Sequence, residues 1–272
     1  MSFDTTENSN DDGRPIFLYA FNLGSATWRY TSSDADVIHG GYKWTAVPIS
    51  DDGVKLTGEA NTETMTITAP NTIAPVQMFI GTPPSQTIIV NIFHYHESDN
   101  ESVLGYVGEL IQINQPQPGL ATLSCNTISV SMQRDGLRLG WQRTCPYALY
   151  DDLTCKADKG SHAIVGTVFD VSGNAVLMQG LDGVADGTLA GGFMEWEHPT
   201  RGTEFRGIES QSQSTCVMFG LADGLYYGLQ VKMYPGCDRT PATCALKFNN
   251  LDNYGGVPDM PGKSPFDGNP VF

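Results

Sequence analysis

Basic residues are scarce in this chain of 272 residues, which has 15 Lys and Arg against 30 Asp and Glu and a formal net charge of −15. A protein that grips nucleic-acid phosphates over its general surface shows the opposite balance. The composition therefore argues against broad nucleic-acid binding. It remains compatible with an acidic wall past which nucleic acid slides without sticking.

Long apolar runs are also missing, since no stretch approaches the roughly 18 consecutive apolar residues of a membrane helix. The opening stretch, "MSFDTTENSNDDGRP", is polar and acidic, whereas a signal peptide is basic and then apolar. We therefore expect no membrane association and synthesis in a cytoplasm, where thiols stay reduced. Residues 1–14 are predicted to form a flexible N-terminal arm.

Motifs of catalysis are absent as well: the sequence holds no G-x-S-x-G, no P-loop and no H-E-x-x-H. His94 and His96 lie on one strand face, but no Cys, Asp or Glu pattern nearby completes a metal site. Three acidic pairs are interpreted as solvated charge rather than glycosidase carboxylates: Asp51/Asp52, Asp151/Asp152 and Glu195/Glu197. The sequence predicts no catalytic residue and no enzyme.

Glycine and proline are abundant, at 30 and 16 residues, and only 17% of the chain is charged. With repeated Thr/Val/Ile/Tyr runs, this composition predicts a mainly β protein with many turns. In "TMTIT" the alternation predicts that Met65 and Ile67 face away from the threonines, and the nearly continuous apolar run "TIIVNIFHYH" predicts a strand covered on both faces.

The residue pattern changes near residue 135. The alternation of apolar and polar residues that is typical of strands weakens there and returns at "HAIVGTVFDVSG". We predict a β barrel or sandwich domain over residues 15–138 and a second, β-rich domain over residues 139–272. A short helical turn is expected around Pro146–Tyr150.

Six cysteines fall into two groups. Cys125 and Cys216 lie within strand patterns and are predicted to be small buried core residues. The other four lie in Pro-, Gly- and Asp-containing segments with C-x9-C and C-x6-C spacing: Cys145, Cys155, Cys237 and Cys244. Spacing alone leaves open a zinc or iron–sulfur site, disulfides, or four unrelated cysteines.

The flanking residues narrow these alternatives. The string "YPGCDRTPATCALKFNNLDNYGGVPDMPG" resembles the carboxy-terminal signature of a family of tailed-phage baseplate hub proteins. That family includes the hub of gene transfer agents and is related in role to the minor tail protein L of phage lambda. "GLRLGWQRTCPYALYDDLTC" is similar to the family's first cysteine segment, and the resemblance covers nearly the whole chain from Pro15.

The resemblance implies a structural role and a cofactor. Relatives carry a [4Fe–4S] cluster on four cysteines, which match Cys145, Cys155, Cys237 and Cys244 here. A turn containing Gly255, Gly256, Pro258 and Pro261 is expected to cover the cluster. Zinc is the competing metal for the same four thiols.

The resemblance also implies where the protein acts and what it contacts. Relatives form a hub ring in the tail tip of the virion, assembled in the host cytoplasm. The expected partners are the distal tail protein ring, the central fibre or receptor-binding hub and the tape measure protein. We expect a homotrimer that adapts a sixfold tube to a threefold tip, with DNA passing through the lumen without specific binding.

A second hypothesis comes from a different class of protein. In a secreted or surface β domain that binds carbohydrate or mediates adhesion, the cysteines would hold a structural zinc or form disulfides. The missing signal peptide argues against this alternative.

Overall fold

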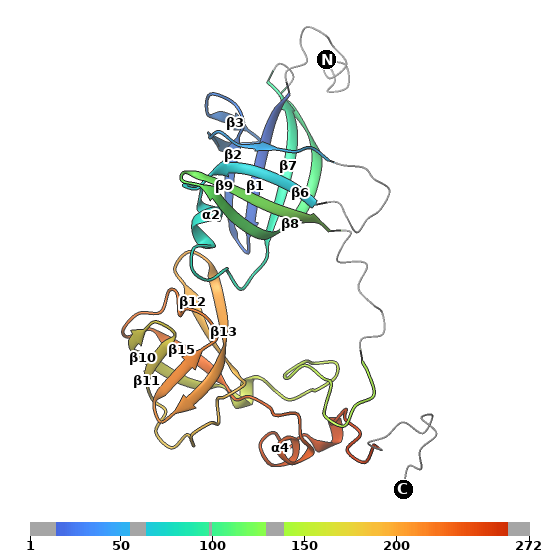
Figure 1. The fold of residues 1–272 in the computed structure, drawn as a ribbon, viewed down its shortest axis with the longest axis vertical. Coiled ribbons are helices and arrows are strands. Elements are labelled where there is room, and N and C mark those ends of the chain that lie inside the picture. Colours follow the sequence, from blue (N-terminus) through green and yellow to red (C-terminus); the bar gives the residue numbers. More distant parts are fainter. Residues whose placement is uncertain (1–14, 55–63, 98–99, 129–138, 261–272) are drawn as a thin grey trace. The chain divides into compact units, whose positions relative to one another are not determined.

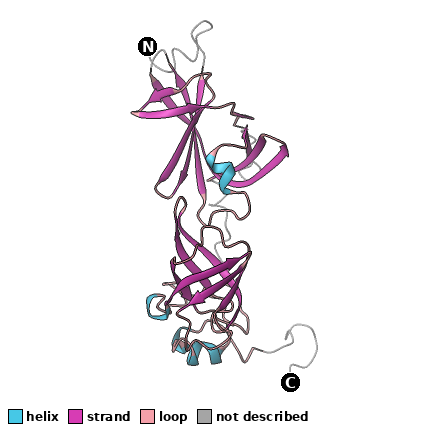
Figure 2. Cartoon of the chain, turned by 90° about the vertical axis from the view of Figure 1, so that its left-hand side faces the viewer, coloured by secondary structure: helices cyan, strands magenta, loops and turns pink. Residues whose placement is uncertain are grey.

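The computed structural model describes residues 15–54, 64–97, 100–128 and 139–260. The chain divides into two compact units, of which the first comprises Met1–Arg134 with His198–Glu204 and the second Asp135–Glu197 with Phe205–Phe272. The predicted arm, residues 1–14, and the predicted domain boundary at residue 138 lie outside the described residues. Strands dominate both units (Figures 1 and 2), so the predicted mainly β fold is confirmed.

The first unit is built on a nine-stranded sheet in the order β3-β4-β2-β1-β7-β8-β9-β6-β5. Only the β2–β4 pairing is parallel. The strands are β1 (Ile16–Leu23), β2 (Ala26–Thr31), β3 (Val37–His39), β4 (Tyr42–Ala46), β5 (Ser50–Asp51), β6 (Thr64–Pro70), β7 (Ile88–His96), β8 (Glu101–Gln117) and β9 (Leu120–Thr127). A short helix, α2 (Ala74–Met78), follows β6 and begins at an N1/N2 proline, where no backbone donor is lost.

Alternation of side chains sets the first core. Met65 and Ile67 are buried while the threonines of β6 are more exposed, as predicted. The central strand β7 contributes Ile88 and Val90 to the main core and Tyr95 to a smaller cluster elsewhere in the unit. A strand that serves two clusters needs an almost uninterrupted apolar sequence, which explains the run "TIIVNIFHYH".

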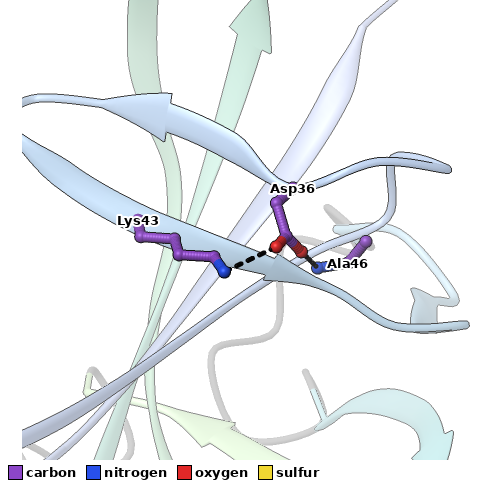
Figure 3. Close-up of polar contacts among 3 residues, drawn as sticks. All are labelled: Asp36, Lys43 and Ala46. Carbon is purple, nitrogen blue, oxygen red and sulfur yellow. Dashed lines mark hydrogen bonds and ion pairs between the residues drawn. The ribbon is translucent and has the colours of Figure 1, made fainter.

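The β3–β4 ribbon at the end of this sheet is fixed by one exposed carboxylate. Asp36 accepts a hydrogen bond from the Ala46 backbone N–H at 2.8 Å and pairs with Lys43 Nζ at 2.7 Å (Figure 3). The Lys43 ammonium and the Ala46 amide hold the pKa of Asp36 below its usual value. Both contacts tie the entry of β3 to β4, which is the outer pair of the sheet.

The second unit contains a closed six-stranded barrel in the order β10-β11-β14-β13-β12-β15. Its strands are β10 (Ile164–Ser172), β11 (Ala175–Gln179), β12 (Phe193–His198), β13 (Gly202–Ser212), β14 (Thr215–Met218) and β15 (Gln230–Tyr234). Fully buried side chains such as Met194 and Ile208 fill its interior. Closure removes the exposed strand edges that an open sheet would leave.

The remaining elements of this unit are short. They are η1 (Gly160–His162) and η2 (Leu251–Asn253), both 3-10 helices, and α4 (Pro241–Leu246). None of the helices in the described ranges is long and apolar enough to cross a bilayer.

The predicted helical turn at Pro146–Tyr150 is wrong, because this segment consists of bends and a turn. Tyr150 adopts a φ of 64°, which is outside the right-handed helical region. The helix lies instead at Pro241–Leu246, where the Thr240 hydroxyl caps the Thr243 N–H and a proline occupies the first turn. Sequence inspection had assigned no helix there.

Cys125 and Cys216 are confirmed as core residues, since both are fully buried within strands. Burial raises the pKa of Cys125 to about 12 and that of Cys216 to about 11. Thiolate is the nucleophilic form, so both side chains are inert at neutral pH.

We therefore expect iodoacetamide at pH 8 to leave Cys125 and Cys216 unmodified in the native protein. Peptide mass spectrometry after brief labelling measures this, and labelling in concentrated urea, where all six thiols react, is the control. Native modification of either strand cysteine at the rate seen in urea would contradict the buried positions.

Candidate metal centre

Two cysteine segments meet at one end of the barrel because of how two strands pair. Cys145 and Cys155 precede β10, whereas Cys237 and Cys244 follow β15. The antiparallel register places Ile164 opposite Met233, so the chain enters β10 where it leaves β15. Segments that are distant in sequence are thereby brought together by the ladder.

All four predicted ligands line one cavity of about 100 Å³. Cys244 is buried and the other three cysteines are half-buried. None of the six cysteines forms a disulfide. The structure therefore does not have the disulfide framework that spacing alone left open.

The wall of the cavity is completed by aromatic and polar residues. The aromatic ones are Tyr147, Phe248 and Tyr254, the polar ones include Asn250 and Asn253, and the aliphatic Leu149 also contributes. Within the described residues, no three His, Cys, Asp or Glu side chains stand close enough to hold a single metal ion. The four thiols share the lining of this one cavity.

Burial and neighbouring charge make two of these thiols, Cys237 and Cys244, costly to ionise. Desolvation raises the pKa of Cys237 and of Cys244, and the neighbouring cysteines raise both further. The Arg239 backbone N–H partly opposes this, because it donates to Cys237 Sγ at 3.3 Å. Four neighbouring thiolates need positive charge, which a metal centre supplies.

A positive φ of 64° at Arg239 shapes the loop between Cys237 and α4. The same residue's carbonyl accepts from the Cys145 backbone N–H at 3.0 Å. One tight turn therefore contacts a sulfur of the second segment and the backbone of the first.

Lys247 fastens the end of α4. Its Nζ donates to the carbonyls of Thr188 and Gly236, each at 2.7 Å, and desolvation lowers the pKa of this ammonium. Lys247 is the C-cap residue of α4, so its two hydrogen bonds anchor the helix that contains Cys244.

The turn after η2 contributes Tyr254 to the wall of the cavity, and Gly255 and Gly256 follow it directly. Tyr254 Oη lies within hydrogen-bonding distance of the Arg143 and Arg239 carbonyls, at 3.0 and 3.1 Å. A Cβ on Gly255 would stand 2.3 Å from the Tyr147 ring, and one on Gly256 would stand 2.6 Å from the Arg143 carbonyl oxygen. Pro261, also expected in this turn, lies outside the described residues.

The histidine pair and the acidic pairs have other roles. The His94 ring packs edge-on against Phe17, with centroids 4.9 Å apart, and His96 is fully buried. At least one carboxylate of each acidic pair accepts a hydrogen bond: Asp51 from Tyr19, Asp52 from the Thr66 N–H, Asp151 from Thr154 and Glu195 from Lys159.

Comparison with known proteins relates the chain to phage proteins and to a protein of a bacterium. Residues 187–264 match the family described as "Phage conserved hypothetical protein BR0599". An uncharacterized protein of Xylella fastidiosa (strain 9a5c) is 26% identical over 184 residues, which is 62% of this chain and 38% of that protein.

The structural match extends over the whole chain. A chain from the virion of a native gene transfer agent particle superposes with a TM-score of 0.76 at 15% identity, covering 100% of this chain and 99% of the other. This chain shares its fold. At that identity the likeness concerns architecture, so the roles of residues are argued from the site itself.

The sequence predicts the four cysteines of the cavity but not the residues whose hydrogen bonds hold the cysteine segments in place. Lys247, Asn250 and Tyr254 lie inside the string "CALKFNNLDNYGG", which was singled out only for its resemblance. A dense run of amide and aromatic side chains directly after a cysteine was the available signal.

Gly236 is a position where adding a single methyl group should displace the loop that carries Cys237. A Cβ there would stand 2.0 Å from the Ala190 carbonyl oxygen and 2.5 Å from the Gly192 nitrogen, both of them backbone atoms. We expect Gly236→Ala to lower the free energy of unfolding of the second unit by about 1–3 kcal/mol or more.

Urea titration followed by circular dichroism measures this loss of stability. Gly160→Ala is the matched control, because its Cβ would approach no atom closer than 3.5 Å. Equal stability of the two variants would contradict the close backbone approach.

Proposed function

We propose that this protein is a structural component of a phage-type tail tip, where it forms a hub ring between the distal tail protein ring and the central fibre or receptor-binding hub. The observation that carries the proposal is the full-length likeness to a chain of a gene transfer agent virion. The phage family match over residues 187–264 supports the same class of particle. The tape measure protein is the further partner we propose in the channel.

The four cavity cysteines are proposed to hold a [4Fe–4S] cluster. Their donor chemistry fits, because clusters of this kind are held by four thiolates. A single zinc ion would need all four sulfurs about 2.3 Å from one point, and metal analysis decides between the two centres. When bound, the inorganic core supplies positive charge that offsets the mutual repulsion of the thiolates.

The proposed centre is structural. It joins the segment before β10 to the segment after β15, neither of which has strand or long-helix structure of its own. Binding free energy of a structural metal appears as folding free energy, on the order of 10 kcal/mol for zinc analogues. Rapid, reversible cycling with a physiological electron donor would contradict a structural role.

Carbohydrate binding, the other class considered, gains no support from the described residues. Its disulfide version has no counterpart in the structure. Its zinc version uses the same four thiols and is distinguished by metal analysis.

Anaerobically purified protein should be brown and contain iron and acid-labile sulfide. Cys145→Ser should lose most of the iron and unfold at lower urea concentration, because one thiolate ligand is removed. Cys216→Ala, in the barrel core, is the matched control and should keep the full iron content. A colourless wild-type protein with one zinc per chain would transfer the site to zinc.

Sedimentation velocity tests the proposed assembly. We expect a homotrimer, on its own or with neighbouring tail proteins present, because a ring that adapts a sixfold tube to a threefold tip requires threefold symmetry. Monomers under both conditions would count against the hub ring while leaving the metal centre unaffected.

A further inference from the structure

Asn250 contacts both cysteine segments at once. It lies directly before η2 and lines the cavity. Its backbone N–H donates to the Cys244 carbonyl at 3.0 Å, and its own carbonyl accepts from Cys244 Sγ at 3.2 Å. Its side-chain Nδ2 donates to the Cys155 carbonyl and lies 3.8 Å from Cys155 Sγ. Asn250 uses its backbone to bond Cys244 and its side chain to bond Cys155. Among the described residues that line the cavity, no other shows this combination.

The orientation of the Asn250 amide is fixed by a second asparagine. Asn253 Nδ2 donates to Asn250 Oδ1 at 2.6 Å. A side-chain amide accepts only at oxygen and donates only at nitrogen, so this bond directs the Asn250 NH₂ toward Cys155. The NH₂ has two hydrogens, one for the Cys155 carbonyl and one for its sulfur.

We propose that Asn250 is a positioning residue that donates an N–H···S hydrogen bond to the Cys155 ligand, with Asn253 setting the direction of the donor. In the loaded centre Asn250 holds Cys244 through the bond from its backbone N–H to the Cys244 carbonyl. The Cys244 S–H bond to the Asn250 carbonyl belongs to the protonated thiol, because a ligand thiolate has no proton to donate. This inference rests on the proposed metal centre. Hydrogen bonds to ligand sulfurs withdraw negative charge from them and tune the reduction potential of an iron–sulfur cluster. Asn250 thus acts on the centre through Cys155 rather than as a ligand.

The experiment compares wild type, Asn250→Leu, Asn250→Gln and Asn253→Ala after anaerobic reconstitution of the full chain with ferrous iron and sulfide. Leucine has a similar size but no donor, so we expect a more negative reduction potential. A tenfold shift of a one-electron equilibrium corresponds to about 59 mV. Glutamine, which keeps the amide, should recover part of the shift, and Asn253→Ala should show a smaller shift in the same direction.

Asp252→Asn is the control within the same loop, because Asp252 is exposed and its substitution leaves both asparagines in place. It should not move the potential in the negative direction. If Asn250→Leu holds iron and sulfide at the wild-type potential, the inference is overturned. If that variant does not fold, Asn253→Ala decides, and a wild-type potential there overturns it equally.

The proposed centre and the role of Asn250 fail in different ways. Wild-type protein that takes up neither iron with sulfide nor zinc disproves the centre itself. If the wild type takes up zinc, cobalt(II) replaces iron as the probe. A thiolate-to-cobalt charge-transfer band that is unchanged in Asn250→Leu then rejects the hydrogen bond to sulfur.

Discussion

The antiparallel pairing of β10 with β15 is the constraint on which the candidate site depends. With Ile164 opposite Met233, the chain enters β10 and leaves β15 at the same end of the barrel. The two cysteine segments therefore both extend from that end. The barrel itself is held by a buried apolar core and by closure, which gives each strand a neighbour on both sides. The loops are different, because they contain little regular structure and depend on cross-links between them. Hydrogen bonds through Arg239, Tyr254 and Asn250 supply part of that cross-linking in the described structure.

Three kinds of contact hold the cysteines in place: strand pairing, the contacts that fix α4, and single side-chain hydrogen bonds. Strand ladders fix the ends of the segments, Lys247 and the Thr240 cap fix α4, and single side-chain bonds set individual sulfurs. In this arrangement the chain passes so close to neighbouring atoms that a Cβ would collide with them at positions 236, 255 and 256, and all three positions are glycine. The arrangement also leaves Cys237 and Cys244 with pKa values raised by desolvation, so that their ionisation is unfavourable in the absence of a positive centre. The proposed cluster resolves that electrostatic cost and adds a covalent link between the loops.

Sequence and structure agree most closely where side-chain alternation is strong. The alternating "TMTIT" identified the buried face of β6, and the strand context of Cys125 and Cys216 identified them as core. Agreement is weakest in segments with no period. Residues Pro146–Tyr150 contain helix-compatible residue types, but Tyr150 has a positive φ, and its ring packs against Phe193, Tyr234 and Phe248, which lie far away in the sequence. The helix at Pro241–Leu246 was missed because six residues give too little periodicity to recognise.

By itself the sequence determined the β-rich class, the separation of core cysteines from loop cysteines and the four candidate ligands, because all of these depend on local pattern and residue type. Only the tertiary structure decided that the four thiols share one cavity, that no disulfide joins them and that Asn250 bonds to two of the four cysteine residues. These features depend on strand register and on which loop ends become neighbours. Register is a property of the whole sheet, since each strand is placed by the burial of its partners, and no short stretch of sequence specifies it.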